Sequence, residues 1–177
     1  MPIRFRQTAT RLRPPLRVFI SSTYRDLVQY REVLKTALET SGYLPVGMES
    51  FPAQDCPSLD ACLAVLDTAN VYVGIIGQLY GSSPPGRAKS YTEFEYNHAR
   101  AQGMYKIVLI MDDDAELKKA HVEQDVKRIA RLERFRKRIK KNQVVQTFRD
   151  PHEAAWKILA ALRTYEARIS ETGGIRR

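Results

Sequence analysis

Two glutamates lie where a loop rich in glycine and proline turns into an expected helix, in the segment SYTEFEY at residues 90–96. Glu93 or Glu95 could act as a catalytic carboxylate at the edge of a ligand pocket. A structural explanation also fits Glu93, because Ser90 and Glu93 have the spacing of a capping box. The two roles are compatible, since the start of a helix also gathers free N–H groups and partial positive charge.

Helix geometry separates the two carboxylates. At 3.6 residues per turn, Glu95 lies about 200° around the helix from Glu93, so we do not expect both to work in one pocket. A glycosidase mechanism with paired carboxylates therefore fits poorly. The inward face of this helix is expected to hold Tyr91, Phe94, His98 and Ala101. We interpret His98 there as a core residue rather than a catalytic one.

The absence of several known motifs argues against some kinds of site. No G-x-G-x-x-G follows the first expected strand and no Walker A motif occurs, which argues against a Rossmann dehydrogenase and a P-loop NTPase. The acidic run at 112–114 could recruit Mg²⁺, but a turn and a helix start explain it more simply. Cysteine and histidine do not occur at metal-site spacing. We expect no metal and no bound cofactor.

Composition favours one soluble domain. The chain has 177 residues, with 44% hydrophobic and 28% charged residues, which is ordinary for a globular protein. No apolar run approaches the roughly 20 residues that span a bilayer, and no apolar h-region follows the arginine-rich start. Cys56 and Cys62 are too few for a disulfide scaffold, so we expect a reduced, cytoplasmic setting.

The positive charge is confined to two segments. Of the net +9, residues 1–17 carry +5 and residues 118–141 carry +8, which leaves −4 on the rest of the chain. A contact with nucleic acid or anionic lipid is one interpretation. We favour a solvated helix face and a disordered arm, and do not expect nucleic acid as a partner.

Strands and helices alternate along the chain. Five short apolar runs predict strands at 16–22, 43–47, 70–77, 106–112 and 142–148. Helical patterns follow each run, at 23–42, after Pro57, at 91–102, at 115–141 and at 150–169. This order predicts an α/β three-layer sandwich of the flavodoxin-like type, with a five-stranded parallel sheet in the order 2-1-3-4-5. The domain is expected at 16–169, between a disordered arm at 1–15 and a tail at 170–177.

In such folds ligands bind at the carboxyl ends of the strands, where the strand order reverses. Here that crevice lies between the first and third strands. The loop at 48–56 and the helix that begins at Tyr91 should close it. Its rim is expected to hold Ser21, Ser22, Thr23 and Tyr24 on one side and Gly77, Gln78, Tyr80 and Gly81 on the other.

Four segments together resemble one known family. They are VFISSTYRDL at 18–27, VYVGIIGQLYGS at 71–82, SYTEFEY at 90–96 and IVLIMD at 107–112. The chain is similar to the TIR-like group catalogued as domain of unknown function 4062, over about residues 16–165. The family usually forms the N-terminal module of larger receptor-like or NTPase-containing proteins.

The resemblance implies an activity. Many TIR-like proteins hydrolyse NAD⁺ at the nicotinamide–ribose bond, often in antiviral or cell-death signalling, and others only assemble. Their essential glutamate, on the helix after the third strand, falls on Glu93, with Glu95 as the alternate. Binding of diphosphate or ribose would fall to hydroxyls of Ser21, Ser22 and Thr23 and to the backbone at Gly77, with Arg25 on phosphate and Tyr24, Phe51 or Tyr80 stacked on a ring.

Three functions are therefore weighed. The first is an NAD⁺ glycohydrolase in stress or antiphage signalling, with NAD⁺ or a related nucleotide as substrate. The second is a non-catalytic module that self-associates or serves a larger receptor or NTPase protein. The third is binding of nucleic acid or anionic lipid through residues 118–141.

Overall fold

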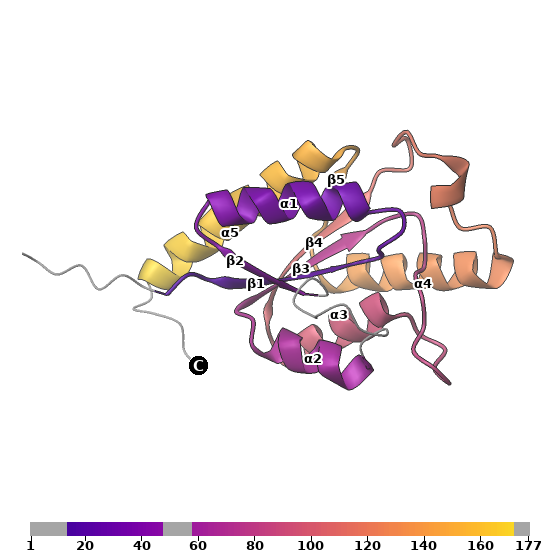
Figure 1. The fold of residues 1–177 in the computed structure, drawn as a ribbon, viewed down its shortest axis with the longest axis horizontal. Helices are drawn as coiled ribbons and strands as arrows, with labels where there is room; N and C mark the ends of the chain where they lie inside the picture. Colours follow the sequence, from indigo (N-terminus) through magenta and orange to yellow (C-terminus); the bar gives the residue numbers. More distant parts are fainter. Residues whose placement is uncertain (1–13, 48–57, 172–177) are drawn as a thin grey trace, which may run out of the picture.

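Five parallel strands form a single sheet in the order β2-β1-β3-β4-β5, which confirms the predicted order (Figure 1). The computed structural model describes residues 14–47 and 58–171. The strands are β1 (Arg17–Ser22), β2 (Leu44–Gly47), β3 (Val71–Ile76), β4 (Tyr105–Met111) and β5 (Gln146–Phe148). The helices are α1 (Val28–Thr40), α2 (Leu59–Asp67), α3 (Tyr91–Ala101), α4 (Val126–Asn142) and α5 (Pro151–Glu171), with a short 3-10 helix, η2 (Lys119–His121).

Helices cover both faces of the sheet, as the uninterrupted apolar strands predict. Every residue of β3 is buried, because a central strand of such a sheet faces a helix layer on each side. In Figure 1, α1 and α5 lie over one face, whereas α2, α3 and α4 lie over the other. The first layer packs through Leu34 and Ile158, and the second through Tyr96 and Phe135.

Pairing between β1 and β3 sets the place of the site. Ser21 lies opposite Gly74, and Ser22 lies opposite Ile75. Both serines follow the apolar residues 18–20 of the strand, so the side chains turn polar where the strand reaches the edge of the sheet. The carboxyl ends of β1 and β3 are therefore neighbours, at the reversal in strand order.

The long helix expected at 115–141 is shorter than predicted. α4 begins only at Val126, after Asp125, whose side chain accepts a hydrogen bond from the N–H of Arg128. A helix over 115–141 would place Val122 and Val126 on one apolar stripe facing the core, but they are 38% and 79% exposed. The segment before α4 is instead bound to the β3–α3 connection, because Glu123 N–H donates to the carbonyl of Gln78 at 2.9 Å.

The ends of the expected domain lie mostly outside the described residues. Of the arm at 1–15, only Pro14 and Pro15 are described, and residues 172–177 of the tail are not. α5 extends two residues into the expected tail. Within 14–47 and 58–171, no helix combines the length and apolar character needed to cross a bilayer.

Candidate active site

A cavity of about 390 Å³ opens beside the carboxyl ends of β1 and β3. Its walls come from the β1–α1 loop, α2, the β3–α3 connection, α3, and the segment that leads into α4. The lining residues are Ser22, Thr23, Tyr24, Arg25, Cys62, Leu79, Gly81, Ser82, Tyr91, Thr92, Glu95, Ala120, Val122, Glu123, Gln124 and Arg128. Its size falls within the range of small-molecule pockets.

Glu95 is the buried carboxylate of this cavity. Its residue is only 4% exposed, and the hydroxyl of Ser21 donates a 2.5 Å hydrogen bond to its Oε2. Burial, with the Glu95 carboxylate as a second cause, raises the pKa of the Tyr72 phenol beneath the site well above its ordinary value of 10.0. Glu95 is thus oriented by a strand residue, whereas the other acidic side chain that lines the cavity, Glu123, is paired with Arg128.

Glu93 lies in a different environment and does not line the cavity. Its Oε2 accepts a 2.6 Å hydrogen bond from the hydroxyl of Tyr80, and its Oε1 contacts Nη2 of Arg138 at 2.8 Å. Ser90 accepts from the N–H of Glu93 at 3.3 Å, which is one half of the predicted capping box, but the Ser90 N–H donates to the Tyr80 hydroxyl rather than to Glu93. Glu93 thus joins the start of α3 to α4, which is a structural role.

The prediction of which residues of α3 face inward is wrong. The buried residues are Thr92, Glu93, Glu95, Tyr96 and Ala99. The line through Thr92, Tyr96 and Ala99 faces the sheet, and the two glutamates flank it on opposite sides. The face was misjudged because aromatic Tyr91 and Phe94 suggested the core, whereas the glutamates find buried partners, Glu95 in the Ser21 hydroxyl and Glu93 in the Tyr80 hydroxyl.

His98 was expected on the inward face and lies at the surface instead. Its side chain is 23% exposed, and its Nε2 contacts the Asp67 carboxylate at 2.6 Å. The pair joins α3 to α2. His98 does not line the cavity.

The nine predicted ligand-binding residues divide into four groups. Those that line the cavity are Ser22, Thr23, Tyr24, Arg25 and Gly81. Ser21 reaches the cavity through its hydrogen bond to Glu95. Gly77 and Tyr80 do not line it, and Phe51 lies outside the described residues.

Gly77 and Tyr80 lie outside the cavity lining and make contacts that fix the β3–α3 connection. A side chain at position 77 would collide with the carboxylate of Asp26, and the Gly77 carbonyl accepts a 2.9 Å hydrogen bond from Nη2 of Arg136. Tyr80 is 3% exposed, and its hydroxyl also accepts a 3.2 Å hydrogen bond from the Ser90 N–H. Both residues hold the β3–α3 connection in place: the Gly77 carbonyl is bound by Arg136, and the buried Tyr80 ring is not open to stack on a ligand.

Asp26 joins the β1–α1 loop to the β3–α3 connection. Its carboxylate accepts from the hydroxyl of Thr23 and, at 3.2 Å, from the N–H of Leu79. Burial raises the pKa of Asp26 above its ordinary value of 3.8, while these hydrogen bonds act in the opposite direction. Two walls of the cavity are therefore connected through one buried carboxyl group.

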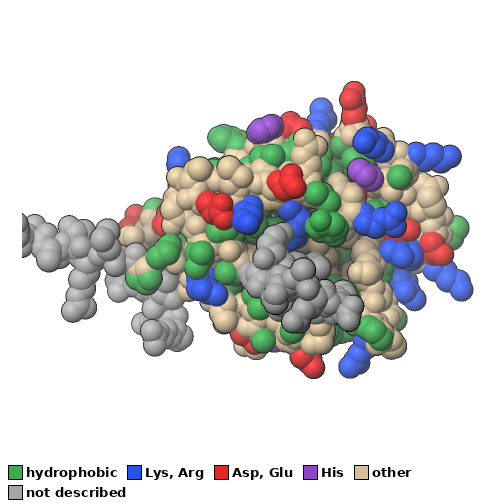
Figure 2. Space-filling view, viewed as in Figure 1, with side chains coloured by type: hydrophobic (Ala, Val, Ile, Leu, Met, Phe, Trp, Pro, Cys, Tyr) green, Lys and Arg blue, Asp and Glu red, His purple; other side chains and the backbone are tan. Residues whose placement is uncertain are grey.

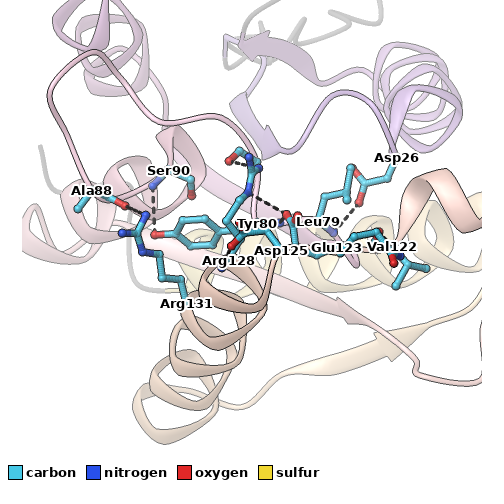
Figure 3. Close-up of polar contacts among 12 residues, drawn as sticks. Asp26, Leu79, Tyr80, Ala88, Ser90, Val122, Glu123, Asp125, Arg128 and Arg131 are labelled. Atoms are coloured by element: carbon cyan, nitrogen blue, oxygen red, sulfur yellow. Dashed lines mark hydrogen bonds and ion pairs between the residues drawn. The ribbon is translucent and has the colours of Figure 1, made fainter.

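The wall formed by residues 120–128 was missed from the sequence. Glu123 accepts from the N–H of Tyr80 at 3.2 Å and pairs with Nε of Arg128 at 3.0 Å. Nη2 of Arg128 donates to the carbonyl of Gly81 at 2.8 Å (Figure 3). The signal was hidden because the basic run 118–141 was interpreted as one solvated helix. Asp125, three residues before Arg128, is an N-cap residue and could have marked the break.

The acidic run at 112–114 has structural partners. Asp112 accepts from the N–H of Asp114 at 3.0 Å and lies 3.5 Å from Nε of Arg149. Asp113 accepts from the side chain of Gln78 at 3.2 Å. Among the described residues, no three histidine, cysteine or acidic side chains are grouped so that they could hold a metal ion.

Comparisons with known proteins identify the family of this chain and a solved structure with a similar fold. The family model described as Domain of unknown function (DUF4062) matches residues 17–163. The chain is also similar to a solved structure described as the activated Roq1 resistosome directly recognizing the pathogen effector XopQ (TIR domains). That match has 12% identity and a TM-score of 0.58, and covers 83% of this chain and 99% of the other. No curated protein matches.

Proposed function

This chain belongs to the DUF4062 family and has a TIR-like fold, and from that premise we propose that it cleaves the nicotinamide–ribose bond of NAD⁺ or a related nucleotide. The observation that supports this is Glu95, a buried carboxylate that lines the cavity at the carboxyl edge of the sheet. We assign the catalytic role to Glu95, the alternate of the two expected glutamates. Glu93 is already engaged by Tyr80 and Arg138.

The chemistry needs little more than a positioned negative charge. When the bond between C1′ and the nicotinamide nitrogen breaks, its electron pair passes to the nitrogen, and nicotinamide leaves as a neutral molecule. Positive charge then develops on the ribose, and a carboxylate stabilises it more strongly than it stabilises the ground state. Water attacks C1′ and loses a proton, giving ADP-ribose. Ser21 would orient Glu95 for this role, since its hydroxyl fixes one carboxylate oxygen.

A pair of conservative variants tests the assignment. Nicotinamide release from NAD⁺ is measured for the wild type, Glu95→Gln and Glu93→Gln, in dilute and in crowded solution, at equal folded fractions. We expect Glu95→Gln to lower the rate of nicotinamide release by at least roughly 100-fold, which is the usual effect of removing a group that stabilises charge in the transition state. Glu93→Gln should stay within about tenfold of the wild type, since its side chain does not line the cavity. Chromatography of the ribose product separates hydrolysis from cyclisation.

Two outcomes would count against the proposal. If the wild type releases no nicotinamide even when crowded, the enzyme proposal fails. If instead Glu93→Gln loses activity and Glu95→Gln keeps it, the enzyme proposal stands, but Glu95 is the wrong residue.

In cellular terms, we propose that the protein acts in the cytoplasm in stress or antiphage signalling. The similar TIR domains belong to a resistosome that recognizes a pathogen effector, which makes a defence role a reasonable extension. A larger receptor or NTPase protein would be its physiological partner.

A non-catalytic assembly module is the second candidate, and exposed apolar side chains favour it. Trp156 on α5 is 67% exposed, and Val144 before the edge strand β5 is 93% exposed. Tryptophan is enriched at protein–protein interfaces relative to the rest of the surface. Sedimentation of the wild type and Trp156→Ala over a range of concentrations tests this, and equal monomer fractions would argue against association through α5.

The third candidate, binding through the basic segment, is weaker than the charge count suggests. Figure 2 shows Lys and Arg side chains gathered on the side of the molecule where α4 lies. Several of these arginines bind their own chain, as Arg131 binds the carbonyl of Ala88 at 3.0 Å and Arg136 binds that of Gly77. A steep loss of binding with added salt would be expected only for this candidate.

A further inference from the structure

Arg128 is a cation that the fold holds at the wall of the cavity. Its Nε contacts Glu123 at 3.0 Å, and its Nη2 donates to the carbonyl of Gly81 at 2.8 Å. The side chain remains 42% exposed and lines the cavity. Within the described part of the chain, these contacts use one edge of the guanidinium and leave Nη1 available to a ligand.

Two other arginines near the site, Arg25 and Arg131, each lack one of the two properties of Arg128, a fixed side chain and access to the cavity. Arg25 also lines the cavity, but it is exposed at the surface, so ordering its long side chain on a ligand costs conformational entropy. Arg131 is held in the same way as Arg128, by a carbonyl of the β3–α3 connection, but it does not line the cavity. Figure 3 shows both α4 arginines directed at that connection. Arg128 alone among these three combines a fixed side chain with access to the cavity.

The cavity thus presents opposite charges from two different helices. Glu95 of α3 contributes a carboxylate, and Arg128 at the start of α4 contributes a guanidinium, whose planar donors match the oxygens of a phosphate. A ligand that develops positive charge at a sugar and carries an anionic phosphate has the matching pattern. We propose that Arg128 is the phosphate-binding residue of this cavity. In taking the ligand to be a nucleotide, this inference rests on the proposed function.

Two ligands that differ by one phosphate test the inference without any turnover. Binding of adenosine 5′-monophosphate and of adenosine to the full chain is measured by calorimetry or NMR titration, for the wild type, Arg128→Gln and Arg131→Gln. We expect the wild type to prefer the phosphorylated ligand. Arg128→Gln should reduce that preference by roughly 10- to 100-fold, which is the scale of hydrogen bonds to charged groups. Arg131→Gln should leave it unchanged.

A second variant guards against a loss of structure. Arg128→Lys keeps the positive charge but not the planar pair of donors, and it should retain part of the preference if Arg128→Gln fails to fold. The inference is overturned if the wild type shows no preference for the phosphate, if Arg128→Gln keeps it, or if Arg131→Gln loses it equally. Absence of nicotinamide release, with this preference intact, would reject the enzyme proposal alone.

Discussion

Replacing Glu93 by glutamine should destabilise the fold measurably. The carboxylate is buried and contacts Arg138 at 2.8 Å, with 6% of the Glu93 side chain and 35% of the Arg138 side chain exposed. Glutamine keeps an acceptor for the Tyr80 hydroxyl, and the bond from the backbone N–H of residue 93 to Ser90 does not depend on the carboxylate. The loss is therefore confined to the charge.

The magnitude follows from how exposed the pair is. Removing one partner of a fully buried pair costs about 3–5 kcal/mol, whereas exposed pairs contribute about 0–1 kcal/mol. Because Arg138 is more than a third exposed, we expect a loss of roughly 1–2 kcal/mol for Glu93→Gln. In a domain of this size that lowers Tm by about 2–8 °C.

A double-mutant cycle isolates this ion pair. The free energy of unfolding is measured by chemical denaturation for Glu93→Gln, Arg138→Gln and the double variant. The cycle is needed because Arg138 also lies over the ring of Phe135, 5.3 Å from its centroid. Glu39→Gln, on the exposed face of α1, is the control and should change stability by less than about 0.5 kcal/mol. A coupling energy near zero would refute the structural role of Glu93.

Three further predictions concern the walls and the core. Gly81→Ala should cost about 1–3 kcal/mol in a denaturation experiment, because φ is +84° there and a Cβ would lie 2.7 Å from Cγ2 of Thr23. Since burial raises the pKa of Asp26 above 3.8, its contribution to stability is complete below that pH and is lost as the pH rises through the folded-state pKa. The free energy of unfolding of the wild type, relative to Asp26→Asn, should therefore fall as the pH rises above 3.8 and through the folded-state pKa. Phe135→Ala should cost about 3–5 kcal/mol of unfolding free energy, since Phe135 is 2% exposed in the core between α4 and the sheet. A smaller loss would mean that the neighbouring side chains move to fill the space left by the ring.

The architecture could be predicted because each signal for it is averaged over a whole strand or helix and does not depend on any single residue. Apolar runs such as β3 and β4 are buried on both faces, so their composition alone indicates central parallel strands. Alternation with helices then fixes the handedness and leaves few possible strand orders.

The site was harder to predict because single contacts decide it. Whether Glu93 or Glu95 faces the cavity depends on which side of α3 packs on the sheet, and here Tyr96 and Thr92 prevailed over Phe94. Arg128 could not be assigned either, since its role depends on Asp125 starting α4 where it does. Charge runs carry no information about which cations the fold will hold against its own carbonyl groups.

The direction of α5 has a consequence for how this domain can be joined to other proteins. Strands run toward the cavity and helices return from it, so β1 starts, and α5 finishes, at the far edge of the sheet (Figure 1). Tyr165 stacks on Tyr105, the first residue of β4, with ring centroids 4.2 Å apart, which fixes the last turns of α5 there. Chain segments that continue from the start of β1 or the end of α5 therefore leave the domain on the side of the sheet away from the mouth of the cavity.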